Sequence, residues 1–196
     1  MQITLFDYGA GNLHSLAKAL RGEGRTVRLE ADPRAALATD VLVLPGVGAF
    51  APAAAALAPA RMAMRDALRD GLPCIGICLG MQLMFEASDE GAGEGLGLFS
   101  GRVTQIDARQ LPQIGWNTLD DVTDVDLRAA TLETAYYANS YVCRPEDSSV
   151  VSAWSSHGND RFPASVRTAR TVGVQFHPEK SSAPGVRFIQ LFLESL

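Results

Sequence analysis

The sequence predicts an α/β fold with an open, mixed but mostly parallel sheet flanked by helices. In the first half of the chain, short apolar runs typical of buried strands alternate with segments whose apolar residues recur at helical spacing. This alternation favours parallel strands joined by crossover helices. From about residue 102 the pattern changes to short strands and turns, which favours antiparallel or mixed pairing. No repeat or linker divides the chain, so we expect one domain over residues 1–196.

The expected elements of the first half follow a regular order. They are a strand at 3–8, a helix at 13–20, a strand at 26–29, a short helical piece at 35–37, a strand at 40–44, helices at 53–57 and 61–68, and an apolar strand from 72 that turns into a helix at Cys78. Gly9 and Gly11 after the first strand suggest a dinucleotide site, but His14 stands where that fingerprint has its third glycine. No cofactor is therefore expected.

The second half is expected to contain five short strands and a closing helix. The strands are predicted at 102–106, 134–142, 150–154, 165–167 and 172–176. Val186, Ile189 and Phe192 contribute to the apolar face of the last helix.

Charge and hydropathy exclude two classes of partner. The chain has 17 basic and 22 acidic residues, a net charge of −5, and no basic run, so nucleic acid is not expected. Two uncharged runs, at 41–60 and 72–85, do not predict a membrane span. Prolines and glycines break the first run, and the second is shorter than the roughly 20 residues that a bilayer requires. The chain begins with a strand-like segment and no signal core, which favours a cytoplasmic location.

Three cysteines cannot all pair, and the spacing of Cys74, Cys78 and Cys143 matches no zinc pattern. We therefore expect reduced thiols and no metal site. Cys74 and Cys143 are interpreted as small buried residues.

Cys78 differs from the other two cysteines because glycines stand two residues to either side of it. This is the spacing of a nucleophile elbow, in which a sharp strand-to-helix turn presents the nucleophile at the edge of a sheet. A side chain at Gly76 or Gly80 would clash with the backbone that folds around the turn. The first amides of the following helix favour thiolate over thiol. The pattern predicts that Cys78 is a nucleophile.

A cysteine nucleophile needs a base, and the chain has three histidines. His14 lies within a predicted helix and His157 in a polar turn, and neither has an evident orienting group. His177 closes a strand and is followed by Pro178 and Glu179. The carboxylate can accept a hydrogen bond from one imidazole nitrogen while the other faces the thiol. Cys78, His177 and Glu179 form a candidate triad.

A glycine-rich loop at residues 45–50 (PGVGAF) follows the third strand. It lies at the carboxyl end of a strand, where open α/β sheets place their active sites. One interpretation is a tight turn before a helix. The other is an oxyanion site, in which backbone amides stabilise charge on a carbonyl oxygen under attack.

Residues 76–82 (GICLGMQ) and 175–181 (QFHPEKS) resemble the motifs of class I, or triad-type, glutamine amidotransferases, which have a flavodoxin-like fold. Residues 7–13 (DYGAGNL), 45–50 and 115–117 (GWN) resemble those of one branch, the glutaminase subunits of imidazole glycerol phosphate synthases of histidine biosynthesis. The five segments span nearly the whole chain in the family's order.

The resemblance implies a glutaminase that hydrolyses L-glutamine to glutamate and ammonia through Cys78, His177 and Glu179. The ammonia would pass to a (βα)₈-barrel cyclase subunit, the heterodimer partner, which forms imidazole glycerol phosphate and an aminoimidazole carboxamide ribotide. The implied oxyanion and substrate-binding residues are Val47, Gly48, Leu79, Gln82, Ser140 and Tyr141. Asn12, Trp116 and Lys180 are implied at the partner interface, although each could be an ordinary surface or core residue.

The chain departs from the family pattern at Gln113 and Asn139, where histidines are usual, in what are expected to be loops around the glutamine site. Amides keep hydrogen-bonding capacity but cannot become cationic. Two other functions remain open. The first is the glutaminase subunit of a pyridoxal phosphate, anthranilate or aminobenzoate synthase, which the sequence at 45–48 argues against. The second is a noncatalytic binding protein with an inert Cys78, which the intact triad argues against.

Overall fold

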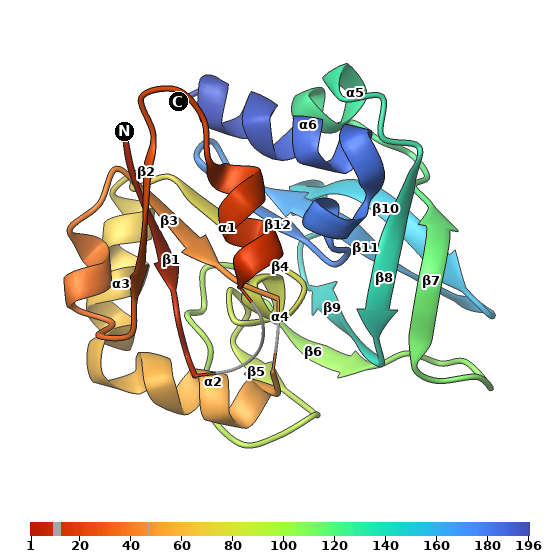
Figure 1. The fold of residues 1–196 in the computed structure, drawn as a ribbon. Coiled ribbons are helices and arrows are strands. Elements are labelled where there is room, and N and C mark those ends of the chain that lie inside the picture. The colour runs from red at the N-terminus through yellow and green to blue at the C-terminus, as the bar shows by residue number, and fades with distance from the viewer. Residues whose placement is uncertain (10–12, 47) are drawn as a thin grey trace.

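The computed structural model describes residues 1–9, 13–46 and 48–196 (Figure 1). The predictions for Asn12 and Val47 therefore lie outside the described residues.

A central sheet runs through the molecule in the order β10-β11-β12-β4-β3-β1-β2. Its strands are β1 (Gln2–Phe6), β2 (Thr26–Glu30), β3 (Val41–Leu44), β4 (Cys74–Ile77), β10 (Val151–His157), β11 (Asp160–Arg167) and β12 (Thr171–Val174). The pairs from β12 through to β2 are parallel, whereas β11 and β10 extend one edge in antiparallel pairing. This arrangement confirms the predicted α/β class with a mixed, mostly parallel sheet.

Helices cover both faces of this sheet (Figure 1). They are α1 (His14–Leu20), α2 (Phe50–Leu57), α3 (Arg61–Arg69), α4 (Leu79–Gln82), α5 (Val125–Ala129) and α6 (Ser182–Glu194), with 3₁₀ turns η1 (Ala35–Leu37), η2 (Ala58–Ala60), η3 (Ser148–Val150) and η4 (Pro178–Lys180). Strand β3 contributes side chains to the cores on both faces of the sheet. Val41 and Val43 pack with α1 and α6, whereas Leu42 and Leu44 pack with α2 and α3. Because successive side chains of a strand point to opposite faces, one fully apolar strand contributes to both cores.

Two smaller sheets lie beside the central one. In the first, β5 (Ala87–Ser88), β6 (Gly101–Gln105) and β9 (Tyr141–Pro145) are neighbours, and in the second β7 (Gln113–Thr118) pairs with β8 (Thr134–Asn139). The prediction of one strand over 134–142 is wrong. The chain leaves β8 at Ser140 and continues as β9 in a different sheet. Alternating hydrophobicity continues through such a change of partner, so it does not mark the break.

Residues 113–118 form a strand, which corrects the expectation that Gln113 lies in a loop. Gly115 has φ +129°, a conformation that favours glycine, and Asn117 has low strand propensity, so the local sequence does not favour a strand. The pairing with β8, from Gln113 opposite Asn139 to Thr118 opposite Thr134, holds the segment extended. Asn139 ends β8, in agreement with the predicted strand over 134–142 and not with the expected loop.

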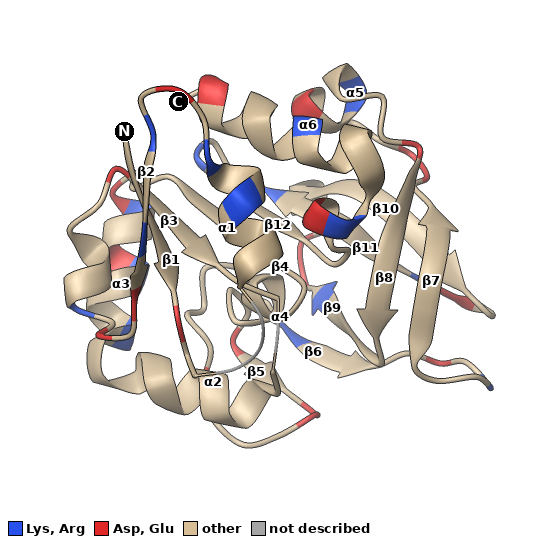
Figure 2. Ribbon diagram, viewed as in Figure 1, with Lys and Arg blue, Asp and Glu red and all other residues tan. Residues whose placement is uncertain are grey.

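The charged residues are spread over many elements, with both signs interspersed (Figure 2). Among residues 1–9, 13–46 and 48–196, we find no helix whose length and apolar character would let it cross a bilayer.

Replacing Gly80 with alanine should destabilise the protein. An ideal Cβ at Gly80 would lie 2.0 Å from the carbonyl oxygen of Leu44, so α4 could no longer pack against the end of β3. We expect Gly80→Ala to lower the free energy of unfolding by about 1–3 kcal/mol or more, measured by urea denaturation. Gly22→Ala is the control, because a Cβ there would meet only the flexible Arg25 side chain, at 3.3 Å. An equal effect of both variants would contradict this packing argument.

Candidate active site

Cys78 lies in the single-residue turn between β4 and α4. Its backbone has φ +48° and ψ −105°, which is uncommon and strained for a residue with a side chain. The turn is held at both ends: Cys78 N donates to the Val174 carbonyl at 2.6 Å, and Gln82 N donates to the Cys78 carbonyl at 3.1 Å. The cysteine is 6 % exposed. The helix that follows is a single turn, shorter than the apolar run to residue 85 suggests.

The glycines on either side of Cys78 make this turn possible. An ideal Cβ at Gly76 would lie 2.8 Å from the carbonyl carbon and oxygen of Gly80. At Gly80, the Cβ would collide with the Leu44 carbonyl. The expectation that both positions require glycine is therefore confirmed.

His177 and Glu179 form a buried pair at the end of β12. The imidazole Nδ1 lies 2.9 Å from Glu179 Oε1, and the two side chains are 3 % and 7 % exposed. The turn η4 brings Glu179 back toward His177. Burial lowers the pKa of His177, but hydrogen bonds with Cys78 and Glu179 outweigh it and raise that pKa to about 9. The contacts with Cys78 and Glu179 therefore favour the imidazolium form of His177.

The loop after β3 passes directly against this pair. An ideal Cβ at Gly46 would lie 2.9 Å from Cys78 Cβ and 3.0 Å from His177 Cε1, so only glycine fits there. Gly48, in the same loop, has φ +109°. The buried Tyr8 hydroxyl donates to the Pro45 carbonyl and fixes the start of the loop. The sequence identified this loop but did not show that Gly46 contacts both reactive side chains.

A cavity of about 240 Å³ opens beside Cys78. Predicted site residues that line it are Gly48, Leu79, Gln82, Ser140 and Tyr141. The structure thus brings together, around one cavity, residues from the loop after β3, the elbow and the β8–β9 junction. Pro112 and Asn139 also contribute to its wall.

Glu90 lines the same cavity and is a site residue that sequence analysis missed. Its carboxylate accepts a hydrogen bond from Phe50 N at 3.0 Å, and its own N–H donates to Ser88 Oγ at 3.1 Å. The sequence offers little signal, because an acidic residue in a glycine-rich loop usually lies on a solvated surface. Gln175, inside the motif that contains His177, was also assigned no role, yet its side chain contacts Cys78.

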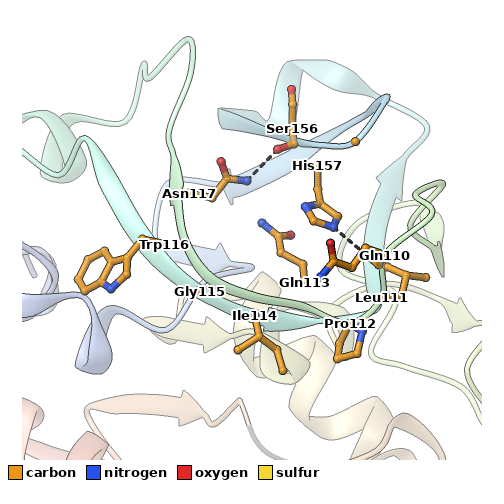
Figure 3. A pocket seen from close by; sticks show the side chains of 11 residues that line it. Gln110, Leu111, Pro112, Gln113, Ile114, Gly115, Trp116, Asn117, Ser156 and His157 are labelled. Atoms are coloured by element: carbon orange, nitrogen blue, oxygen red, sulfur yellow. Dashed lines mark hydrogen bonds between the residues drawn. The ribbon is translucent and has the colours of Figure 1, made fainter.

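The other two histidines lie in different surroundings. His14 begins α1. His157 ends β10, and its Nε2 lies 2.9 Å from the Gln110 carbonyl. Figure 3 shows His157 and Gln113 facing a separate polar cavity of about 520 Å³, while Ile114 and Trp116 point away from it. His157 thus contacts the loop before β7.

The remaining thiols fit the structural role predicted for them. Cys74 and Cys143 are fully buried and free, and burial raises the pKa of both. Within the part of the chain that the structure describes, no group of three or more His, Cys, Asp or Glu side chains could hold a metal ion.

Two of the residues predicted at a partner interface share an exposed aromatic patch. Trp116 is 55 % exposed and packs edge-on against Tyr136, with ring centroids 6.3 Å apart. Lys180 Nζ lies 5.9 Å from the centre of the Tyr136 ring. Ile114, on the same face of β7 as Trp116, is also exposed. We call Ile114, Trp116, Tyr136 and Lys180 the β7–η4 patch.

The family model for "Glutamine amidotransferase class-I" matches residues 4–195. The chain belongs to the class I glutamine amidotransferases. This amidotransferase is also similar to curated proteins named "Imidazole glycerol phosphate synthase subunit HisH". It is 40 % identical to that of Nocardia farcinica, over 99 % of this chain and 98 % of the relative, and 42 % identical to that of Symbiobacterium thermophilum, over 96 % and 91 %. These likenesses show that it belongs to the HisH family.

Solved structures support the fold of this amidotransferase independently. A structure titled "Crystal structure of glutamine amidotransferase" aligns with a TM-score of 0.74 at 18 % identity, over 97 % of each chain. "Structure of PurLQS from Thermotoga maritima" aligns with a TM-score of 0.73 at 19 % identity, over 99 % of this chain and 98 % of that one. At these identities the likeness shows the class I fold alone.

The stability of this amidotransferase should fall between pH 6.5 and 9. The folded pKa of His177, about 9, lies above its ordinary value of 6.5. The folded state therefore binds more protons in this window, and the stabilisation present below pH 6.5 is lost as the pH rises through 9. The loss should be about 1 kcal/mol or more, because one unit of pKa shift corresponds to about 1.4 kcal/mol, and it is measured as the free energy of unfolding in urea at each pH. His177→Gln removes the titration and should flatten the profile, and Glu179→Gln should reduce its slope. Parallel profiles for all three proteins would contradict the assignment.

Proposed function

We propose that this chain is the glutaminase subunit of an imidazole glycerol phosphate synthase. It would hydrolyse L-glutamine to glutamate and ammonia, and pass the ammonia to a cyclase subunit that forms imidazole glycerol phosphate and an aminoimidazole carboxamide ribotide. The observation that carries the proposal is the connected set Cys78, His177 and Glu179 beside a cavity, in a chain of the HisH family.

Cys78 thiolate attacks the side-chain amide carbon of glutamine in the first half of the reaction. The new bond joins Sγ to carbon, and the former carbonyl oxygen becomes an oxyanion. His177, as an imidazolium, donates its proton to the amide nitrogen when the carbon–nitrogen bond breaks, and ammonia leaves. Glu179 holds the imidazole by the 2.9 Å contact with Nδ1 and stabilises its positive charge.

Neutral His177 acts as a base in the second half. It takes a proton from a water molecule, whose oxygen attacks the γ-glutamyl thioester. The carbon–sulfur bond then breaks, and glutamate and the Cys78 thiolate are released. The imidazolium formed in this step completes the cycle, since the next glutamine again requires a proton for its leaving ammonia.

The oxyanion would be stabilised from two sides of Cys78. Leu79 begins α4, so helix hydrogen bonding leaves its N–H available for the oxyanion. The loop after β3 supplies the other side through Gly48 and, as the sequence predicts, Val47. Gly46 keeps this loop against Cys78 and His177.

The amino-acid part of glutamine would occupy the cavity beside Cys78. Gln82, Ser140 and Tyr141 are the predicted contacts, and all line the cavity. Glu90 adds a negative charge at the same wall, which suits the α-ammonium group of the substrate. Glu90 is thus a recognition residue of the proposed substrate site that the sequence did not indicate.

The cyclase would dock on the β7–η4 patch and, as the sequence predicts, on Asn12. Exposed aromatic side chains are common anchors of protein interfaces, and Lys180 adds a charged group beside them. We propose a (βα)₈-barrel partner in a heterodimer, with ammonia passing between the subunits. A single domain, a cytoplasmic location and the absence of nucleic-acid or membrane partners complete the proposal, supported by the three free cysteines and the interspersed charges.

Cys78→Ala should abolish glutamine-dependent synthesis while leaving ammonia-dependent synthesis intact. The purified chain is mixed with the cyclase subunit, and glutamate release and imidazole glycerol phosphate are measured with and without the nucleotide substrate. The wild-type chain alone should hydrolyse glutamine slowly and accelerate in the complex. A Cys78→Ala complex that uses glutamine at the wild-type rate would disprove the nucleophile assignment. Full activity of the isolated wild-type chain would contradict its dependence on the partner.

Glu90→Gln should weaken glutamine binding with a smaller effect on turnover. The variant keeps an oxygen that can accept from Phe50 N, but it loses the charge that would face the α-ammonium group. We expect KM for glutamine to rise about 10-fold or more, as for a lost hydrogen bond to a charged group. Glu94→Gln is the matched control, because Glu94 lies in the same loop but pairs with Arg61 at 2.6 Å. An unchanged KM in Glu90→Gln would remove Glu90 from the site.

A further inference from the structure

Gln175 is a fully buried amide whose side chain connects Cys78 with the wall of the glutamine cavity. Its exposed fraction is 0 %, and its Nε2 donates to Cys78 Sγ at 3.5 Å. The Oε1 of Gln175 accepts a hydrogen bond from Gln82 Nε2 at 3.4 Å. The Nε2 of Gln82 also donates to the Tyr141 carbonyl at 3.0 Å. Gln82 and Tyr141 both line the cavity. A continuous chain of contacts therefore runs from the sulfur to the cavity wall.

We propose that Gln175 is a positioning residue that holds the sulfur of Cys78 through its amide N–H and favours the thiolate form. The inference rests on the proposed role of Cys78 as the nucleophile. Gln175 lies two residues before His177, at the end of β12, so the donor and the base reach the sulfur from the same strand end.

Gln82 fixes which end of the Gln175 amide faces the sulfur. A side-chain amide has one end that donates and one that accepts. Rotating it by half a turn would place the Gln175 NH₂ group against the NH₂ group of Gln82, and its carbonyl oxygen against the sulfur of Cys78. The first contact would then join two donors, and the second would place a carbonyl oxygen against a thiolate, so both would be repulsive. The observed orientation satisfies both ends and presents a donor to Cys78.

Packing alone does not explain an amide at this position. Burying an amide group costs free energy unless it is hydrogen-bonded, and a methionine or leucine would fill similar space without that cost. Both polar ends of Gln175 are satisfied by side chains of the proposed site. The amide also restricts rotation of the Cys78 side chain, which adds to the constraint that the backbone at φ +48° imposes.

The test compares Gln175→Met and Gln175→Glu with wild type in the complex with the cyclase. Methionine has a similar length and no donor, whereas glutamate keeps the shape and an acceptor for Gln82 but replaces the donor with a carboxylate. The rate at which iodoacetamide alkylates Cys78 is measured against pH by peptide mass spectrometry, together with kcat and KM for glutamine.

We expect the midpoint of the alkylation profile to move upward by about one pH unit in Gln175→Met and further in Gln175→Glu. The kcat should fall about 10-fold or more, with KM changed less than about 3-fold, because the substrate contacts remain. Titratable side chains that interact electrostatically with Cys78 include His177, Tyr8 and Cys143, and both variants leave them unchanged.

Gln190→Met is the matched control. Gln190 is partly buried and its amide also donates within the protein, to the Ala19 carbonyl, but it lies on α6 and makes no contact with Cys78 among those described. Its alkylation profile should match that of wild type. Wild-type midpoints and kcat in both Gln175 variants would overturn the inference while leaving the proposed function intact. A wild-type complex without glutaminase activity would instead overturn the proposed function. Gln175→Glu preserves the test if Gln175→Met proves unstable.

Discussion

The backbone turn at Cys78 is the constraint on which the rest of the site depends. A residue with a side chain is held at φ +48°, and this geometry persists only where the surroundings determine it. Here the surroundings are glycines at 76 and 80, the Leu44 carbonyl against α4, and the hydrogen bond from Cys78 N to Val174. The strands on both sides of β4 therefore take part in the turn. The backbone strain is confined to Cys78, but the contacts that hold it come from the central strands β3 and β12.

The register of the parallel strands explains why the reactive groups meet. Leu44 pairs with Gly76, and Val174 pairs with Ile77, so β3, β4 and β12 end at almost the same level. The residues that follow these ends are Gly46, Cys78 and His177, and they lie in contact. The antiparallel strands β10 and β11 extend the sheet beyond this point. Only strands that share a direction bring their following loops to one edge, which accounts for the position of the site.

Sequence reasoning succeeded for features whose cause is local. Glycines spaced around Cys78, and a carboxylate two residues after His177, follow from steric and hydrogen-bonding limits within a few residues. The central sheet was also predictable, since short apolar runs that alternate with helical segments are local patterns. Prediction from the sequence failed at Ser140, where the chain changes sheets. It also failed at Gln113 to Thr118, where pairing with β8 overrides weak strand propensity. Glu90 and Gln175 were missed because long-range packing determines their contacts.

The proposed partner surface and the proposed base share backbone and side-chain contacts. His177 N donates to the Tyr136 carbonyl at 2.8 Å, while the ring of Tyr136 belongs to the β7–η4 patch. Ser181 closes the connection, since its hydroxyl donates to the His177 carbonyl at 2.7 Å and accepts from Tyr136 N at 2.9 Å. Lys180 directly follows Glu179. A protein that docks on this patch therefore contacts residues one hydrogen bond or one peptide from the imidazole. Coupling between partner binding and glutamine hydrolysis requires no long pathway in this geometry, because Glu179 lies within η4 and His177 directly precedes it.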